Sequence, residues 1–78
     1  MTLLQLRRIL ASFGVSEDTS RGKGSHTLFY KHIDGGVQSY PVPKHGKEVQ
    51  NCYVSGARKK FKLTKADGIS DEDFFGQG

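Results

Sequence analysis

Apolar positions in the first fourteen residues recur at intervals of three and four, which is the pattern of an amphipathic helix. Thr2 and Gln5 have the spacing of a capping box, and Gly14 suits the left-handed residue that follows a helix end. The pattern therefore predicts a helix from about Leu3 to Phe13. Its apolar stripe consists of Leu3, Leu6, Ile9, Leu10 and Phe13, and its outward positions are Arg7, Arg8 and Ser12.

A polar, glycine-rich stretch follows, with room for a short strand near Val15 and a loop across Thr19 to Gly24. The next run, SHTLFYKHI, has the aromatic and β-branched content of a strand. Both faces of this strand carry apolar residues, so the alternation does not decide which face is buried. One face holds His26, Leu28, Tyr30 and His32, and the other holds Thr27, Phe29 and Lys31.

A hairpin signal follows this strand at Asp34 and Gly35, after which VQSYPV returns as the partner strand. Proline has no N–H to donate to a neighbouring strand. Pro41 and Pro43 therefore either end the returning strand or confine it to a sheet edge.

A second helix is predicted over CYVSGARKKF, with Asn51 as its cap. Within its apolar stripe of Tyr53, Val54, Ala57 and Phe61, we expect Tyr53 and Phe61 to lie in the core. Gly56 costs a helix interior about 1 kcal/mol relative to alanine, so it either permits a close approach or marks a misplaced helix boundary. Arg58, Lys59, Lys60 and Lys62 spread around the rest of this helix, and the three lysines form either a solvated face or an RNA contact.

The last residues place Ser70 and Asp73 at capping spacing before Phe74 and Phe75, which need cover from this domain or from a partner. The order of elements predicts an α+β fold, α-β-β-β-α, in which two helices back a three-stranded antiparallel sheet. At 78 residues and without a low-complexity linker, the chain is predicted to be one domain over 1–78. Its core spans about 3–63, and an acidic tail spans about 64–78.

The cysteine content and the N-terminal sequence indicate the cellular compartment expected for this chain. A lone Cys52 makes no intramolecular disulfide. The N-terminal stretch MTLLQLRRIL is interrupted by Gln5, Arg7 and Arg8, so it reads as neither a signal peptide nor a membrane span. These features predict a protein of a reducing, cytoplasmic compartment.

The net charge of +4 hides an uneven distribution. Residues 1–65 contain all 12 Lys and Arg and four of the 8 acids, giving +8, whereas residues 66–78 contain the other four acids, giving −4. A body this basic suits a polyanion such as nucleic acid, because cations that neutralise phosphates release condensed counterions. The acidic segment favours a helix N-terminus or competes with RNA for basic surface.

Candidate chemistry concentrates in RGKGSH, residues 21–26. Metal-independent RNA cleavage needs a base for the ribose 2′-hydroxyl proton, an acid for the leaving 5′-oxygen and positive charge for the transition state. His26 suits either proton role near neutrality. Arg21 and Lys23 suit phosphate, and Gly24 lets a backbone approach closely. Ser25 is placed to orient the substrate or the imidazole.

A second proton carrier is less defined, and the candidates are His45, then Tyr30, then His32. His45 is preferred because it lies in the loop PKHGKE, where Lys44 and Lys47 supply further cations. The three histidines and Cys52 lack the spacing of a zinc site, so we expect neither a metal nor another cofactor.

Taken together, these segments resemble the HicA family of toxins. The resemblance rests on LRRILASFG, the GKGSH step into a strand, the hairpin, YPVPKHGKEV and the closing basic helix, and it covers about residues 3–63. It implies a double-stranded-RNA-binding-like domain that cleaves mRNA and is neutralised by a HicB antitoxin. It also implies that His26 is the catalytic histidine and Gly24 a glycine of the family motif. The closing helix departs from the family pattern, which commonly enters it through a PGT-like turn.

Three functions remain open from the sequence. The preferred one is an mRNA endoribonuclease, the toxin of a type II toxin–antitoxin system that inhibits translation under stress. The second is a noncatalytic RNA-binding module, which would read RNA through phosphate and 2′-hydroxyl contacts. The third is a protein-interaction domain whose basic face meets an acidic partner.

Overall fold

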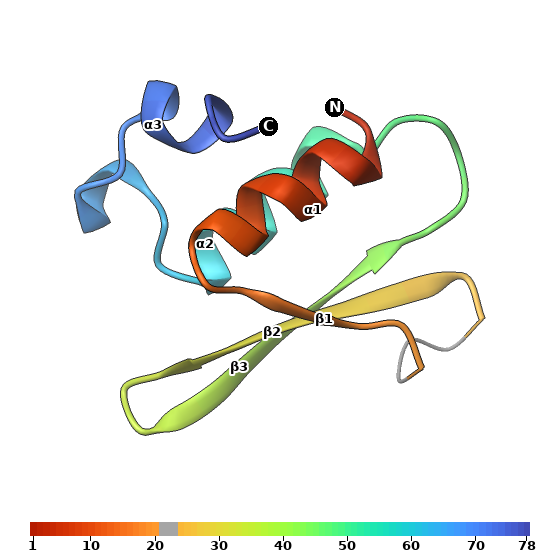
Figure 1. Cartoon of the computed structure of the whole chain (residues 1–78), viewed down its shortest axis with the longest axis horizontal. Coiled ribbons are helices and arrows are strands. Elements are labelled where there is room, and N and C mark those ends of the chain that lie inside the picture. Colours follow the sequence, from red (N-terminus) through yellow and green to blue (C-terminus); the bar gives the residue numbers. More distant parts are fainter. Residues whose placement is uncertain (21–23) are drawn as a thin grey trace.

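The computed structural model of the chain describes residues 1–20 and 24–78, and residues 21–23 lie outside this description. Three strands and two longer helices form the body, and two short helical segments complete the chain (Figure 1). The elements are α1 (Leu3–Ser12), β1 (Ser16–Asp18), β2 (His26–Ile33), β3 (Gly36–Pro43), α2 (Asn51–Lys60), the 3-10 helix η1 (Lys65–Asp67) and α3 (Asp71–Phe75).

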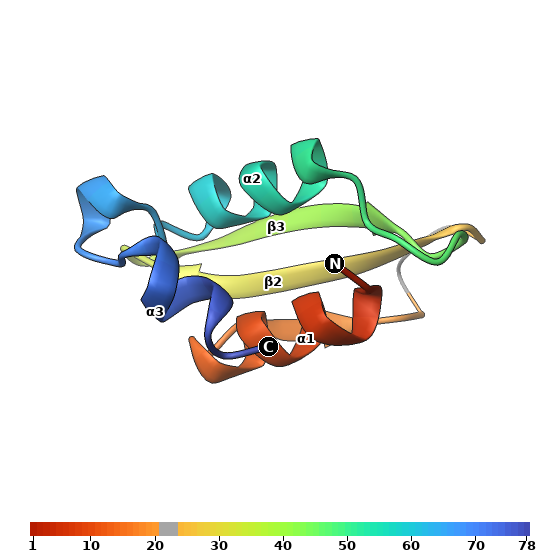
Figure 2. The same ribbon diagram turned by 90° about the horizontal axis from the view of Figure 1, so that it is seen from above.

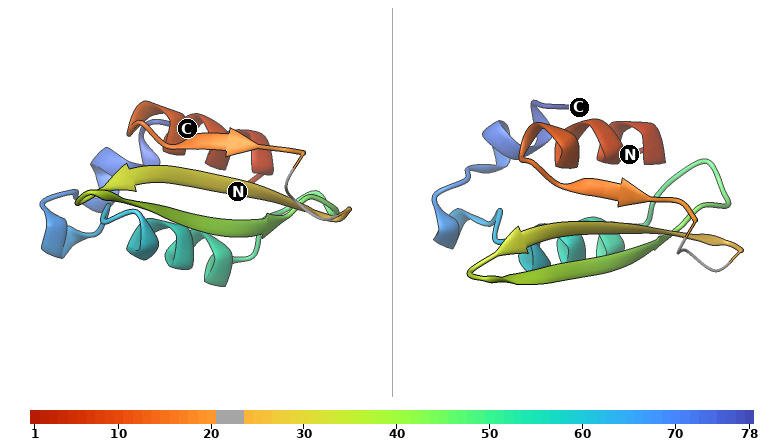
Figure 3. Two further views of the ribbon diagram at one scale, coloured as in Figure 1. Left: turned by 90° about the horizontal axis from the view of Figure 1, so that it is seen from below. Right: turned by 60° about the horizontal axis from the view of Figure 1, so that its bottom comes forward.

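The strands form an antiparallel sheet in the order β1-β2-β3, with β2 in the centre. Helices α1 and α2 lie on the same face of this sheet (Figures 1 and 2). Seen from below, the strands lie in front of both helices and the second face stays uncovered (Figure 3). The predicted α+β fold, with two helices backing a three-stranded sheet, is confirmed.

Burial identifies the face of β2 that packs on the helices. Phe29 is 1% exposed and Thr27 is 0% exposed, and both pair with residues of the adjacent strand β3 that face the same side. Because side chains alternate along a strand, His26 and every second residue after it lie on the open face. That set is His26, Leu28, Tyr30 and His32.

The core lies between the sheet and the helices, and it draws on nearly every element. Phe61 belongs to it at 1% exposure, as expected, whereas Tyr53 is only partly buried against it. Its buried members are Leu6, Ile9, Leu10, Val15, Phe29, Val42, Val49, Val54, Ala57, Phe61, Leu63 and Phe74.

The start of α1 confirms the predicted capping box. The Gln5 backbone N–H donates to Thr2 Oγ1 at 3.1 Å, and the Thr2 backbone N–H donates to Gln5 Oε1 at 2.8 Å. Gly14 follows the helix with a φ of +81°, a conformation that favours glycine. Both features depend on neighbours in the chain, and the sequence alone locates them.

The start of α2 differs from the prediction. Its cap is Gln50, which makes no side-chain capping bond, and Asn51 is already the first helical residue. The prediction of Asn51 as the cap is therefore wrong. Backbone bonds fix the first turn instead, because the Gln50 carbonyl accepts from the N–H groups of Tyr53 and Val54.

Gly56 lies where α2 crosses β3. A Cβ built on Gly56 would lie 2.0 Å from Tyr40 Oη and 2.6 Å from Tyr40 Cζ. A side chain at Gly56 would require the Tyr40 ring to move, so the predicted close approach is confirmed. Tyr40 is the β3 residue that pairs with Phe29 on the helix-facing side of the sheet.

The acidic segment packs back onto the body. Phe74 is 0% exposed and stacks on Phe13 with a centroid distance of 6.0 Å, while Phe75 is 47% exposed. The Ser70 hydroxyl accepts from the Asp73 N–H at 3.0 Å, as the capping spacing predicted. Figure 1 shows α3 beside α1.

Arg58 joins α2 to this segment. Its guanidinium donates to the Leu63 carbonyl at 2.7 Å, the Ile69 carbonyl at 2.7 Å and the Asp71 carboxylate at 2.6 Å. It also lies 4.8 Å from the centre of the Phe74 ring. Arg58 is thus part of the packed structure rather than of a solvated basic face.

Candidate functional site

His26 opens β2 on the uncovered face of the sheet. Its ring is partly exposed, and Nδ1 lies 3.1 Å from the Ser25 hydroxyl oxygen. A serine hydroxyl can donate to Nδ1 or accept from it, because its hydrogen rotates. Ser25 can therefore hold the imidazole with Nε2 protonated or with Nε2 free.

The loop that carries the second set of predicted residues begins beside His26. His26 pairs with Pro43, and the Lys44 backbone N–H donates to the Ser25 carbonyl at 2.6 Å. Antiparallel pairing of β2 with β3 thus brings residues 24–26 and 43–45 to one end of the sheet. Lys44, His45 and Lys47 are all exposed there.

Two of the predicted residues around His26, Arg21 and Lys23, lie outside the described residues. Gly24 is described, with a φ of +57° and no other atom within 4 Å of a built Cβ. Its backbone conformation, rather than lack of space, is what favours glycine at this position.

His45 and His32 lie in different places relative to His26. His45 lines a hollow of about 320 Å³ that also includes Glu48 and Tyr53, beside the start of α2. His32 lies at the far end of β2, opposite Val37. Six residues of strand separate it from His26, about 20 Å. The structure therefore brings the loop of His45, and not His32, to the end of the sheet that carries His26.

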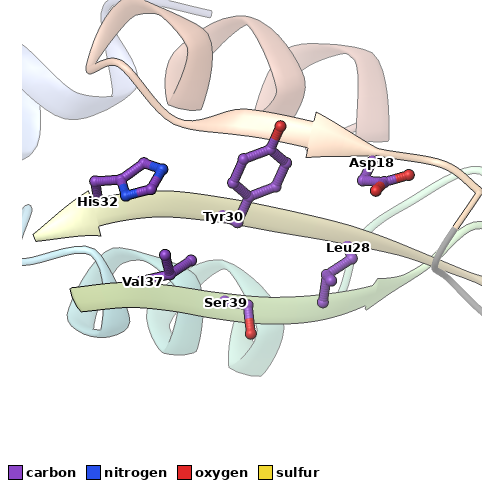
Figure 4. Close-up of a pocket in the computed structure, with 6 residues that line it drawn as sticks. All are labelled: Asp18, Leu28, Tyr30, His32, Val37 and Ser39. Atoms are coloured by element: carbon purple, nitrogen blue, oxygen red, sulfur yellow. The ribbon is translucent and has the colours of Figure 1, made fainter.

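The open face itself is hollowed. Tyr30 and His32 project from β2 into a depression of about 370 Å³, which Figure 4 shows with its lining side chains. Val37, on β3, is 56% exposed. The lining residues are Asp18, Leu28, Tyr30, His32, Val37 and Ser39. Sequence alternation placed the β2 members on one face, but it did not predict the depression.

A carboxylate that the sequence did not single out lies behind His26, on the helix-facing side. Glu17 accepts from Arg7 Nε at 2.5 Å and Nη2 at 3.0 Å, and from the Thr27 hydroxyl at 2.6 Å. The hydrogen bond from Arg7, more than any other contact, holds the pKa of Glu17 below its usual value, and Thr27 and Lys44 act in the same direction. Burial opposes this effect.

The Arg7–Glu17–Thr27 network ties α1 and β1 to the first residues of β2. Arg7 was predicted to face outward, but its side chain is 40% exposed and pairs with Glu17. The hydrogen bond to Glu17 raises the pKa of Arg7. Thr27 directly follows His26, so the network fixes the backbone from which the imidazole projects. The network positions His26 without touching it.

Within residues 1–20 and 24–78, no three His, Cys, Asp or Glu side chains gather in a way that would hold a metal ion. Nor is any helix in that part of the chain long and apolar enough to cross a membrane. Comparison of the chain with protein-family models, curated proteins and solved structures found no match.

Proposed function

We propose that this chain is a metal-independent endoribonuclease of the HicA type, a double-stranded-RNA-binding-like domain that cleaves mRNA and so inhibits translation in the cytoplasm. The proposal makes His26 the catalytic residue. The observation that carries it is the position of His26: partly exposed, at the start of β2, with Nδ1 against Ser25 and a cationic loop beside it.

The chemistry follows from the two states that Ser25 allows. When Nδ1–H donates to the Ser25 oxygen, Nε2 is free to take the proton of a ribose 2′-hydroxyl. The 2′-oxygen then attacks the adjacent phosphorus, and the bond to the 5′-oxygen breaks. The 5′-oxygen leaves with a proton from an acid, for which His45 is the first candidate because its loop begins beside Ser25.

Positive charge at the phosphate completes this proposal. Lys44 and Lys47 lie in the loop that follows Pro43, the partner of His26. Arg21 and Lys23 precede His26 by five and three residues in the sequence. These cations suit the charge that develops on the phosphoryl oxygens in the transition state. Resemblance to HicA further implies a HicB-like antitoxin that blocks access to His26.

The test is cleavage of a long single-stranded RNA by the purified protein with a chelator present. We expect His26→Ala to lower the cleavage rate by about 10²–10⁴-fold, the range of one general acid or base. His32→Ala is the matched control, because it removes a histidine from the same face of the same strand, and its rate should stay near that of the wild type. Circular dichroism checks that both variants fold.

Three results would overturn the enzyme proposal: no cleavage by the wild type, equal cleavage by His26→Ala, or equal losses in both histidine variants. RNA that binds but is not cut would favour the noncatalytic module instead. A substrate with 2′-O-methyl groups should resist cleavage, because its 2′-oxygen has no proton to lose. Co-expression of a HicB-like antitoxin should relieve growth arrest caused by the wild-type chain.

A further inference from the structure

A basic groove lies between α2 and the edge strand β3, away from His26. Its volume is about 390 Å³. The depression on the open face includes Asp18, and the hollow beside His45 includes Glu48, but the described residues that line this groove include no carboxylate. Its lining residues are Gln38, Tyr40, Gly56, Lys59, Lys60 and Lys62.

Packing of α2 on β3 builds the groove. Gly56 lets the helix approach the Tyr40 ring, whose hydroxyl would lie 2.0 Å from a Cβ at that position. Gln38 and Tyr40 both belong to the helix-facing set of β3, with Val42 as its buried member. One wall therefore carries neutral hydrogen-bonding groups, and the last turn of α2 supplies cations on the other.

Three other cations of the body are engaged within the fold. Arg58 holds the C-terminal segment, Arg7 pairs with Glu17, and Lys31 Nζ donates to the Phe13 carbonyl at 2.8 Å. At the groove, Lys62 pairs with Asp34. Among residues 1–20 and 24–78, neither Lys59 nor Lys60 has a carboxylate within ion-pair distance, and both are exposed.

A helix dipole favours lysines in the last turn of any helix. This effect accounts for cations at the end of α2, but not for a groove between them and Tyr40 whose described lining includes no carboxylate. Lysine ammonium groups and a phenolic hydroxyl are among the donors that bind phosphate oxygens of nucleic acid.

The groove lies within reach of an RNA strand that is bound at His26. Pro43 pairs with His26, and Tyr40 and Gln38 lie three and five residues away along β3, about 10 and 17 Å. β3 is an edge strand, so an extended phosphodiester chain can cross from the open face to the groove without passing another strand.

We propose that Lys59 and Lys60, with Tyr40, bind the phosphate backbone of RNA at a second site, several nucleotides from the bond that His26 cleaves. This inference rests on the proposed ribonuclease function, because it assigns part of the same substrate to the groove. It makes RNA length a determinant of affinity: a long RNA contacts both sites, and a dinucleotide contacts His26 alone.

The experiment compares two double variants of equal charge, Lys59→Gln/Lys60→Gln and Arg8→Gln/Lys65→Gln. Arg8 and Lys65 are exposed and do not line the groove. The probe is a fluorescent single-stranded RNA with 2′-O-methyl groups throughout, and its dissociation constant is measured by anisotropy across a range of salt concentrations. A dinucleotide substrate is assayed in parallel for cleavage.

We expect the groove variant to bind the long RNA on the order of tenfold more weakly at about 0.1 M salt. The slope of log K against log salt should flatten by about 1.4, since each phosphate contact on a single strand contributes about 0.7. The control should keep the slope and affinity of the wild type. Cleavage of the dinucleotide should be the same for the wild type and both variants.

Equal losses in the two variants would overturn the inference, because they would reflect net charge alone. Unchanged binding by the groove variant would overturn it as well. Both results leave the ribonuclease proposal standing if the wild type still cleaves RNA and His26→Ala does not. Conversely, selective loss in the groove variant of a chain that never cleaves RNA would support the site and reject the enzyme.

Discussion

Glu17 is the residue whose contacts most clearly give this small domain a pH-dependent stability. Its pKa in the fold lies below the usual value of about 4.5, chiefly because Arg7 donates to it. The folded state therefore binds fewer protons than the unfolded state near that pH. The stability that Glu17 contributes is fully present above about pH 4.5. It is lost as the pH falls through the lowered pKa of Glu17 in the folded protein.

We expect Glu17→Gln to reduce the free energy of unfolding by about 1.5–3 kcal/mol at pH 7, the range for a hydrogen bond to a charged group. The difference from the wild type should shrink as the pH falls below 4.5. Urea unfolding at a series of pH values measures it. Glu48→Gln is the control, because Glu48 is 67% exposed and its ion pair in the described part of the chain is with the Met1 amino group. A pH-independent difference at Glu17 would contradict the assignment.

Features at the residue scale could be predicted where the interacting residues lie close together in the sequence. The Thr2–Gln5 capping box is confirmed because its partners are three residues apart. Glu17 escaped notice because Arg7 and Thr27 each lie ten residues from it. Its strand is only three residues long, too short for alternation to mark an inward carboxylate.

Between elements, the contact of α2 with β3 depends on a missing side chain. We expect Gly56→Ala to destabilise the fold by about 1–3 kcal/mol through overpacking against Tyr40, despite the higher helix propensity of alanine. In a Tyr40→Ala background, the same change should be neutral or stabilising by about 1 kcal/mol. Denaturant unfolding of the four proteins in this cycle measures the coupling. The same cost in both backgrounds would show that Tyr40 is not the cause.

The faces of β2 show why element type was easier to predict than packing. Its strand character follows from composition, but apolar residues occupy both faces. The choice depends on where the helices lie: Thr27 is fully buried because its hydroxyl has Glu17 as a partner, while Leu28 and Tyr30 line the open face. A buried threonine beside an exposed-face leucine inverts what side-chain hydrophobicity alone predicts.

At the scale of the whole molecule, the acidic segment completes the core that residues 3–63 leave open. The sequence showed that Phe74 and Phe75 need cover, but not which of them the body covers. That depends on Arg58, whose guanidinium binds two carbonyls and a carboxylate of the returning chain. The candidate site was also predicted only in part. The backbone hydrogen bond between Ser25 and Lys44 joins residues that are far apart in the sequence, so local patterns do not reveal it.

The two phenylalanines provide a matched test of whether this segment is structural. Phe74 is 0% exposed and Phe75 is 47% exposed, although they are neighbours on one short helix. We expect Phe74→Ala to cost about 3–5 kcal/mol. A domain of this size has only about 4–12 kcal/mol of total stability, so that loss would bring it close to unfolding at 25 °C. Phe75→Ala should cost about 1 kcal/mol or less, since its ring already meets solvent.

Chemical denaturation and amide hydrogen exchange of both variants distinguish a packed segment from an appended one. If the segment completes the core, Phe74→Ala shifts the single unfolding midpoint and raises exchange throughout α1 and α2, because Phe74 stacks on Phe13 and lies under Arg58. If equal and small losses were found for the two variants, with exchange raised only in α3, the segment would be an appendage. The basic body and its acidic end would then be independent parts of the chain.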